Sequence, residues 1–409
     1  MGLYLDRISS CFAPKLRTHF TTELRFAITR SSDLAIREAN LTPSLISDFA
    51  NQDEVFARGF AILQQATKNR AFPCASTAVT HRGRLVALKA FGNFTFDADS
   101  PPAHPDTIFD LASITKVMAT TSMAALLYQR GLLDIEMPVV GVVPEFAVDV
   151  SGANDSRRSE VSFRMLLTHS SGLPAHLPLY ERAGTCDELT NLAAKTPLTN
   201  DPGMQVEYSD IGFIVLGEAL SRLADERLDT FCQREIFGPL GIARTGFNPP
   251  AEQRAWIPPT LDNQGFRHRV IQGEVNDDNA SAMGGVAGHA GLFAPAEDLA
   301  NFAHAILGGG APVFRPQSLA LFTKRETLPP ETTRTPGWDT PGQNSLAGKY
   351  FSPGSFGHLG FTGTSLWIDP ERQISITLLT NRTWPDGKNI GIRQVRPEFH
   401  DAVMESLIL

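Results

Sequence analysis

A serine followed three residues later by a lysine, Ser113 and Lys116, stands at the head of an apolar, helix-prone run over residues 117–128. If this run forms a helix that begins at Ser113, the two side chains lie on one face, one turn apart. Ser113 then lies at the positive end of the helix, where a developing negative charge is stabilised. A neighbouring amine activates a serine hydroxyl when it accepts or relays its proton. The pair is thus a candidate nucleophile with its base, although on its own it also fits a solvated helix start.

The bulk composition excludes several classes of protein. The chain has 409 residues, which allows two or more domains or one domain with a large insertion. It is 42% hydrophobic and 20% charged, as soluble globular proteins are. The formal charge of -8 and the absence of a Lys/Arg run predict no nucleic-acid partner. No apolar run reaches the ~18–20 residues that cross a bilayer, so no transmembrane segment is expected.

The N-terminus and the cysteines bear on the compartment. Residues 1–7 lack a basic stretch followed by an apolar core, so no signal peptide is expected and a cytoplasmic location is favoured. The four cysteines are widely spaced without a C-x-x-C pair, which favours free thiols in a reducing compartment. The ten histidines show no metal-ligand spacing, so neither a metal nor another cofactor is predicted. The sequence leaves the oligomeric state open.

The predicted elements change in character along the chain. Residues 1–50 have no clear period and are interpreted as an extension of uncertain order. Helical patterns and loops dominate the middle of the chain, and strands occur toward both ends. The expected strands are 76–80, 85–90, 365–369 and 373–379, and the expected helices are 53–69, 113–131, 188–195, 211–223, 230–237, 296–307 and 392–409.

This order of elements predicts an α/β (α+β) fold in which both chain ends build one layer. Residues 51–112 and 335–409 are expected to form the sheet region. Residues 113–334 are expected to form a large, all-helical inserted region that carries the Ser113 helix. The active site is expected at the interface of the two regions.

Acyl transfer requires a second proton carrier near Ser113, and Tyr208 is the best candidate. It follows a Pro-Gly pair and precedes a helix-like run over 211–223, so a loop can aim its hydroxyl into a cleft. A protonated Lys116 nearby favours the phenolate, because an opposite charge stabilises it. The alternative is a partly buried tyrosine that packs beneath the loop.

A glycine-rich segment, residues 357–363, supplies a third element. Its three glycines lie beside His358 at an expected strand edge and allow another backbone to approach closely. A substrate can then pair edge to edge with this strand. The amide N–H of Phe361 can form an oxyanion hole with that of Ser113. A β-bulge is the alternative explanation of the glycines.

The three elements resemble the serine β-lactamase and penicillin-binding-protein family, whose motifs occur in the order S-x-x-K, Y-x-N and K-T-G or H-x-G. The matching residues are Ser113-Ile114-Thr115-Lys116, Tyr208-Ser209-Asp210 and His358-Leu359-Gly360, with supporting stretches at 166–173, 284–293 and 379–382. The likeness is nearest to class C β-lactamases and their esterase and D-aminopeptidase relatives. It runs from about residue 53 to the C-terminus.

The resemblance implies both a fold and a reaction. The fold is β-lactamase/transpeptidase-like, with an antiparallel sheet flanked by N- and C-terminal helices. Ser113 is implied as the acylated nucleophile, while Lys116 and Tyr208 share its proton and Tyr208 helps to activate the deacylating water. The amides of Ser113 and Phe361 bind the oxyanion. A serine hydrolase of this kind cleaves an ester or amide through a covalent acyl-enzyme.

Asp210, His358 and Gly360 form the expected substrate-binding group, and the first two depart from the family pattern. Asp210 replaces the usual Asn, so an amide donor becomes an acceptor-only carboxylate, or else Asp210 pairs with Lys116 and holds it charged. His358 replaces the usual Lys, and a neutral imidazole holds a substrate carboxylate weakly. Both changes favour neutral esters or other amides over penicillins. Small acyl esters and peptidoglycan or D-amino-acid peptides therefore rank ahead of β-lactams.

A binding module is the alternative to an enzyme. A sensor that binds a β-lactam or muropeptide with little turnover fits Asp210, His358 and the lack of a visible export signal, but it has no need of the complete catalytic set. His169, His289 and Asp278 also lie in motif-like stretches, and hydrogen bonds to the loop backbone are the preferred interpretation of the two histidines. Family relatives often work in the periplasm or cell envelope, so the compartment stays open.

Overall fold

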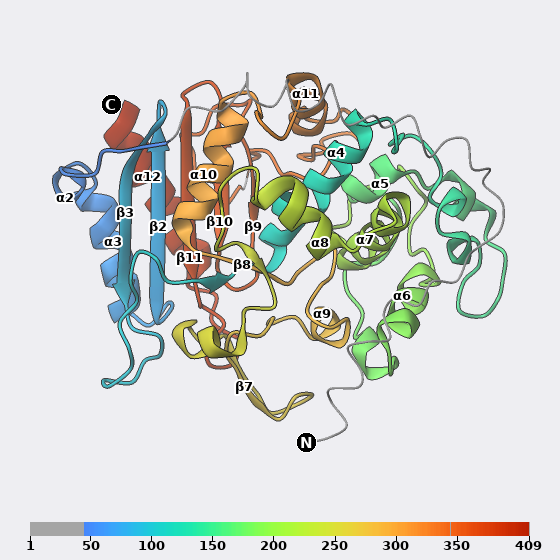
Figure 1. Cartoon of the computed structure of the whole chain (residues 1–409), viewed down its shortest axis with the longest axis horizontal. Coiled ribbons are helices and arrows are strands. Elements are labelled where there is room, and N and C mark those ends of the chain that lie inside the picture. Colours follow the sequence, from blue (N-terminus) through green and yellow to red (C-terminus); the bar gives the residue numbers. More distant parts are fainter. Residues whose placement is uncertain (1–44, 344, 409) are drawn as a thin grey trace.

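The computed structural model describes residues 45–343 and 345–408. It contains a six-stranded sheet, which occupies the left part of the view in Figure 1. The strand order is β1-β3-β2-β11-β10-β9. These strands are β1 (Ile46–Ser47), β2 (Cys74–His81), β3 (Arg84–Gly92), β9 (Phe356–Leu359), β10 (Ser365–Asp369) and β11 (Ile374–Thr380). Most of the extension predicted over residues 1–50 lies outside the described residues. The two halves of the sheet come from the two ends of the chain, as the order of predicted elements indicates.

Two antiparallel hairpins meet at the centre of the sheet. β2 and β3 form the predicted hairpin, whose tight turn places Arg82 and Gly83 at positive φ. β10 and β11 form the second, and β11 pairs antiparallel with β2, with Thr377 opposite Ala78. β9 pairs antiparallel with β10 at one edge. At the other edge β1 pairs with β3 in parallel, a two-residue pairing too short for the sequence to indicate.

Helices cover both faces of the sheet, which explains why β2 and β11 are buried along almost their whole length. On one face, α3 (Ala57–Lys68), which follows α2 (Gln52–Val55), packs against α12 (Ile392–Ile408). On the other face, α10 (Ala296–Leu307) lies over β2 and β11 (Figure 1). The sheet is therefore flanked by the predicted N- and C-terminal helices on one side and by a helix of the inserted region on the other.

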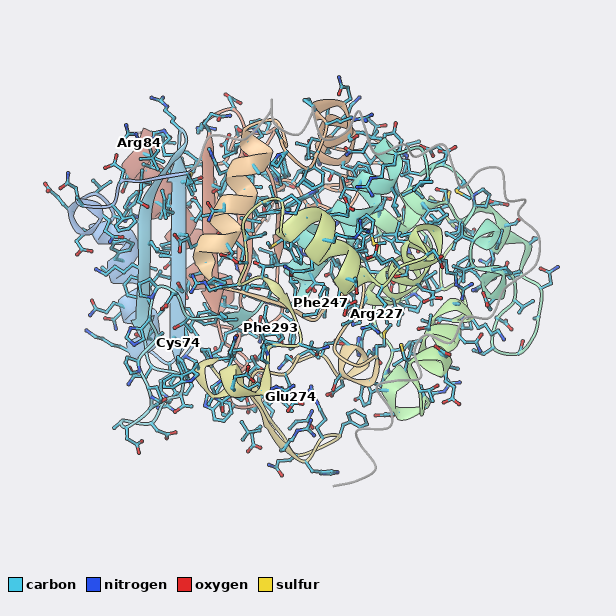
Figure 2. The ribbon with its side chains drawn as sticks, viewed as in Figure 1. Cys74, Arg84, Arg227, Phe247, Glu274 and Phe293 are labelled. Atoms are coloured by element: carbon cyan, nitrogen blue, oxygen red, sulfur yellow. The ribbon has the colours of Figure 1, made fainter. Side chains whose placement is uncertain are left out.

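Apolar side chains fill the space on each side of the sheet. Beneath α3 and α12 they include Phe72, Trp367 and Phe399, all of which are buried. Each fully buried side chain of this size contributes about 1.5–3 kcal/mol. Figure 2 shows Arg84 at the rim, where the β2–β3 hairpin turns, and Cys74 at the buried start of β2.

The region between the two halves of the sheet is mainly helical. Its α-helices are α4 (Ser122–Gln129), α5 (Phe163–Leu167), α6 (Cys186–Ala194), α7 (Asp210–Ala224), α8 (Leu228–Cys232), α9 (Asp278–Ala282), α10 and α11 (Pro316–Thr323). Shorter turns of 3₁₀ or π type are η4 (Val139–Gly141), η5 (Pro144–Ala147), η6 (Ser156–Glu160), η7 (Leu179–Glu181), η8 (Gln233–Phe237) and η9 (Ala251–Trp256). None of the helices in the described residues is both long and apolar enough to cross a membrane.

Four short strands interrupt residues 113–334, which the sequence predicted to be all helical, and a fifth lies just before them. β4 (Phe109–Asp110), β8 (Leu292–Ala294) and β5 (Gly246–Phe247) form a small sheet, and β6 (Leu261–Asn263) pairs with β7 (Arg269–Ile271). Strands of two or three residues are too short to show an alternating pattern, so the sequence did not indicate them. β4, an edge strand of this small sheet, ends just before the segment that carries Ser113.

The helix predicted from Ser113 to Gly131 is present as three joined segments. They are the 3₁₀ turn η2 (Ala112–Ile114), the π turn η3 (Lys116–Thr121) and α4. Gly131 follows with a φ of 71°, the left-handed conformation in which helices often end. η3 and most of α4 are buried, so the nucleophile candidate lies on a helix inside the molecule and not at a solvated helix start.

Candidate active site

Ser113 and Lys116 lie within hydrogen-bond distance. Lys116 Nζ donates to Ser113 Oγ at 3.1 Å, because only Thr115 separates η2 from η3 and the two side chains lie one turn apart. Ala112, just before the serine, has a φ of 48°, in the left-handed region where a β-carbon causes strain. Its amide N–H donates to Asp110 Oδ1 at 2.8 Å. That bond holds the backbone that presents Ser113.

The side chain of Lys116 is fully buried, and its ammonium has three acceptors. They are Ser113 Oγ, Asp210 Oδ1 at 2.6 Å and the backbone carbonyl of His289 at 3.0 Å. Burial lowers the pKa of Lys116, but the charges and hydrogen bonds of Asp210 and Tyr208 outweigh this effect and raise it overall. Three acceptors occupy all three protons of an ammonium. Lys116 is therefore held as a cation.

Tyr208 lies beside both groups, at the end of the loop that leads into α7. The Ser209 hydroxyl caps this helix by accepting from the Gly212 amide at 2.9 Å, which fixes the chain next to Tyr208. The phenol of Tyr208 faces Lys116 and Ser113, with Lys116 Nζ 5.0 Å from the centre of the Tyr208 ring. Burial raises the pKa of Tyr208, the Lys116 charge lowers it and the Asp210 charge raises it, with a net rise. Lys116 favours the phenolate as expected, but burial outweighs that effect.

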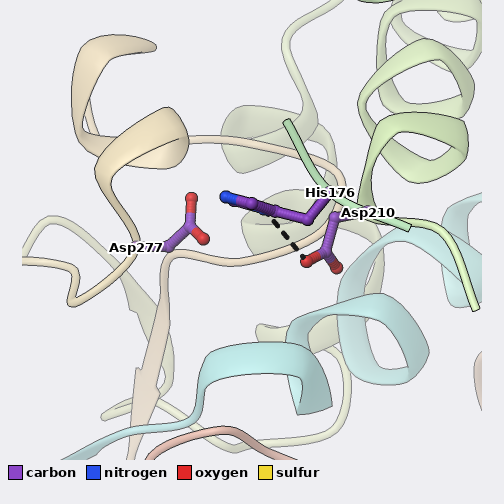
Figure 3. Close-up of side chains that lie close together, drawn as sticks. All are labelled: His176, Asp210 and Asp277. Atoms are coloured by element: carbon purple, nitrogen blue, oxygen red, sulfur yellow. Dashed lines mark ion pairs between the residues drawn. The ribbon is translucent and has the colours of Figure 1, made fainter. Parts of the chain in front are cut away.

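Asp210 pairs with Lys116, the second of the two roles that its replacement of Asn suggests. Its other oxygen, Oδ2, lies 3.9 Å from Nδ1 of His176. Figure 3 shows the His176 imidazole between the carboxylates of Asp210 and Asp277. Ligand atoms of these three residues lie within 4.8 Å of one another, an arrangement that the sequence did not predict. Asp210 is already paired with Lys116, and Asp277 is already paired with His289. Both carboxylates therefore have partners within the protein.

His169 and His289, the two histidines of the motif-like stretches, form hydrogen bonds next to these residues. His169 Nδ1 accepts from the Ser209 amide at 3.0 Å, and its ring lies 4.5 Å from the Tyr208 ring. The preferred interpretation, a hydrogen bond to the loop backbone, is therefore confirmed for His169. It is wrong for the side chain of His289, whose Nε2 bonds Asp277 Oδ1 at 2.8 Å. Asp277 was missed because its neighbour in sequence, Asp278, fits the same motif-like stretch equally well.

Asp110 is a second residue that the sequence did not single out. Its Oδ2 accepts from the amide of Asn276 at 2.6 Å, while Oδ1 holds Ala112. Burial raises the pKa of Asp110 to about 6, although both backbone hydrogen bonds oppose this rise. Asp278, which the sequence did name, binds the buried guanidinium of Arg267 at 2.8 Å. The only available signal for Asp110 was its place three residues before the serine.

His358 lies on β9 with its ring 5.9 Å from that of Tyr208. Its Nδ1–H donates to the Leu359 carbonyl at 2.8 Å. Burial holds the pKa of His358 well below its usual range, and the charges of Lys116 and Arg334 lower it further. The imidazole is therefore neutral, and it offers a substrate carboxylate a dipole where a lysine would offer a charge.

Gly360 and Phe361 follow β9 in a turn that lies against the Ser113 segment. A β-carbon on Gly360 would lie 2.6 Å from the Leu111 carbonyl oxygen, so this close approach requires glycine. The amides of Ser113 and Phe361, the two expected oxyanion donors, are thus carried by two backbone segments in direct contact. The structure places Ser113, Lys116, Asp210 and Tyr208 together and sets the turn after β9 against the segment that carries Ser113.

Comparison with known proteins covers most of the chain. Residues 60–396 match the family described as Beta-lactamase. A putative D-alanyl-D-alanine carboxypeptidase of Salmonella agona strain SL483 is 31% identical over 347 residues, which is 76% of this chain and 79% of the relative. This match spans the sheet region and the inserted region together, because neither alone is long enough to account for it.

Solved structures share the fold at lower identity. EstCE1, a hydrolase with promiscuous acyltransferase activity, has a TM-score of 0.69 and 22% identity, covering 86% of this chain and 99% of its own. A class C beta-lactamase from Rhodobacter sphaeroides has a TM-score of 0.66 and 20% identity, again covering 86% and 99%. The fold predicted from the motifs is confirmed. The chain belongs to the Beta-lactamase family and is a serine hydrolase that cleaves an ester or amide through a covalent acyl-enzyme.

Proposed function

We propose that Ser113 is the acylated nucleophile and that Tyr208, rather than Lys116, accepts its proton. The observation that carries this proposal is the set of three acceptors around the buried Lys116 ammonium. An ammonium that donates in all three directions has no lone pair for a further proton. The phenol of Tyr208, which lies beside Ser113 and Lys116, is then the proton acceptor that the site offers.

Acylation follows from this arrangement. The reactive form of the site carries the Tyr208 phenolate, which is the minor form at neutral pH because the pKa of Tyr208 is raised overall. The Ser113 proton moves to this phenolate as Oγ bonds to the substrate carbonyl carbon, and the Lys116 charge stabilises the phenolate. The amides of Ser113 and Phe361 donate to the oxyanion. Tyr208 then gives the proton to the leaving nitrogen or oxygen as its bond to carbon breaks. In deacylation Tyr208 takes a proton from water as the water oxygen bonds to the acyl carbon. Tyr208 then returns this proton to Ser113 Oγ as the bond between Oγ and the acyl carbon breaks.

We infer that the substrate is a peptide that ends in D-alanyl-D-alanine. The relative at 31% identity, a putative D-alanyl-D-alanine carboxypeptidase, supports this choice. The neutral His358 offers little to a terminal carboxylate, but the Arg334 guanidinium lies 5.5 Å from the Tyr208 ring centre and supplies a positive charge nearby. Small neutral esters are the second candidate, because a neutral His358 suits an uncharged substrate and EstCE1 shares the fold.

Labelling and turnover test the proposal together. A fluorophosphonate is expected to add once to the wild-type protein and not to Ser113→Ala, as read by intact-protein mass spectrometry. An equal adduct on Ser113→Ala would contradict the assignment of the nucleophile. Release of more than one equivalent of p-nitrophenol from p-nitrophenyl butyrate separates an enzyme from a sensor that stays acylated. Release of D-alanine from N-acetyl-D-alanyl-D-alanine, with no cleavage of the L,L peptide, supports the carboxypeptidase.

A further inference from the structure

Two buried threonine hydroxyls join the segments that carry the expected oxyanion donors. Thr362 Oγ1 donates to the Asp110 carbonyl at 2.8 Å, and Thr364 Oγ1 donates to the Leu111 carbonyl at 2.9 Å. Both threonine side chains are fully buried, so water does not compete for these bonds and each is stronger than it would be in solvent. The bonds connect consecutive carbonyls just before Ser113 to the turn after β9.

The turn after β9 is closed on itself. The Gly360 amide donates to the Thr364 carbonyl at 2.8 Å, and the Gly363 amide donates to the Gly360 carbonyl at 3.0 Å. Gly360 O and the Phe361 N–H belong to the same trans peptide, so they point in opposite directions. Fixing the carbonyl on one side therefore fixes the direction of the Phe361 N–H on the other.

Residues at and just after the end of β11 form hydrogen bonds to the same turn. Arg382 Nε donates to the Phe361 carbonyl at 2.6 Å, and the Arg382 amide donates to the Thr362 carbonyl at 2.9 Å. Thr380 Oγ1 also donates to the Thr362 carbonyl, at 3.1 Å. The turn is thus tied to β11 through its own carbonyls and to the Ser113 segment through its two threonine hydroxyls.

We propose that Thr362 and Thr364 are positioning residues that set the spacing between the Ser113 and Phe361 amides. The inference rests on the proposed function, since it requires these amides to bind the oxyanion. Such donors stabilise the transition state when they are preorganised, within about 0.5 Å of the productive geometry. Loss of a hydroxyl frees the turn without removing a substrate contact. The effect should therefore fall on kcat more than on KM.

Paired substitutions test this role. Thr362→Val and Thr364→Val keep the shape of the side chain and remove the hydroxyl, while Thr362→Ser and Thr364→Ser keep the hydroxyl. Thr77→Val is the matched control, because the fully buried Thr77 hydroxyl donates to the Thr377 carbonyl at 2.7 Å within the sheet. That variant loses an equivalent hydrogen bond away from the oxyanion donors.

With p-nitrophenyl butyrate, each Val variant is expected to lower kcat about 10–100-fold and to change KM by less than about threefold. Its affinity for an alkylboronic acid, which forms a tetrahedral adduct with the serine, should fall in parallel. The Ser variants should stay within about threefold of wild type, and Thr77→Val should lower Tm without lowering kcat. Unchanged kcat in both Val variants, or an equal loss in Thr77→Val, would overturn the inference alone. A wild-type protein that takes no label at Ser113 would overturn the proposed function and the inference with it.

Discussion

The Nζ atom of Lys116 lies 2.6 Å from Oδ1 of Asp210, at a position where the family pattern has Asn. The carboxylate helps to raise the pKa of Lys116 and, through its charge, that of Tyr208 as well. An asparagine at the same place carries no charge and has no such effect. Besides burial, a residue that departs from the family motif therefore contributes to the protonation state of the site.

Asp210→Asn is expected to move the pH profile of kcat/KM to lower pH. Removing the carboxylate lowers the pKa of Tyr208, so its phenolate forms at lower pH and the rising limb shifts toward acid. The pKa of Lys116 falls too, so the ammonium is lost earlier and the falling limb shifts in the same direction. The pKa of Tyr208 is raised from 10.0 and that of Lys116 from 10.5, so initial rates must extend from neutral pH to the alkaline side of both values to measure the two limbs. Asp225→Asn, at the exposed C-terminal end of the same helix, is the control. A limb that stays in place or moves to higher pH would contradict this account.

Tyr208→Phe should lower kcat about 10²–10⁴-fold, the usual contribution of a general acid–base residue. The phenylalanine ring can still pack against His169, so the fold and the Ser113 position should be kept. Turnover of p-nitrophenyl butyrate and the rate of fluorophosphonate labelling should both fall. Tyr350→Phe removes a hydroxyl that binds Glu405 at 2.6 Å, away from the site, and should leave both rates unchanged. A kcat within tenfold of wild type in Tyr208→Phe would show that another group accepts the proton.

Local patterns made much of the fold predictable. The β2–β3 hairpin depends on the turn at Arg82 and Gly83, and both φ values are positive as the turn requires. The run of helical apolar residues after Ser113 gave the buried helix that carries Lys116. These features depend on neighbours in sequence, which is why spacing alone indicated them.

The residues that the sequence missed act through contacts between distant segments. Asp277 matters because it binds His289, whose carbonyl in turn accepts from Lys116. Asp110 matters because its carboxylate holds both the Ser113 segment and Asn276. A single aspartate carries no pattern of its own, and only the folded backbone shows which amide or imidazole it meets.

Gly288→Ala is expected to damage both stability and activity. A β-carbon on Gly288 would lie 2.1 Å from the Phe213 carbonyl oxygen, so the backbone must move, at a cost of about 1–3 kcal/mol. The next residue, His289, provides a carbonyl acceptor for Lys116, and a displacement there should lower kcat up to about 100-fold. Gly354→Ala is the control, since nothing lies near its β-carbon position. Equal Tm and kcat in the two variants would contradict the prediction.

His400 should make the protein less stable in mild acid. It lies on α12, where its Nδ1–H donates to the Ala347 carbonyl at 2.9 Å and its Nε2 accepts from Ser365 Oγ at 3.2 Å. Burial, aided by the Arg396 charge, lowers its pKa from 6.5 to about 3. Between these values the unfolded chain binds more protons than the folded protein, so stability falls as the pH falls below 6.5. Between pH 7 and pH 5 the loss from this residue is about 2 kcal/mol.

His400→Asn should remove this acid-dependent loss, although the variant starts from a lower stability at pH 7. Asparagine can keep the donor to Ala347, but it has no group that gains a proton in this range. Urea unfolding at pH 5, 6 and 7 gives the free energy of unfolding of each protein. The wild type should lose about 2 kcal/mol more than His400→Asn over this range, while His268→Asn, at an exposed turn, should follow the wild type. Parallel pH dependence in the wild type and His400→Asn would show that the buried imidazole gains its proton without unfolding the protein.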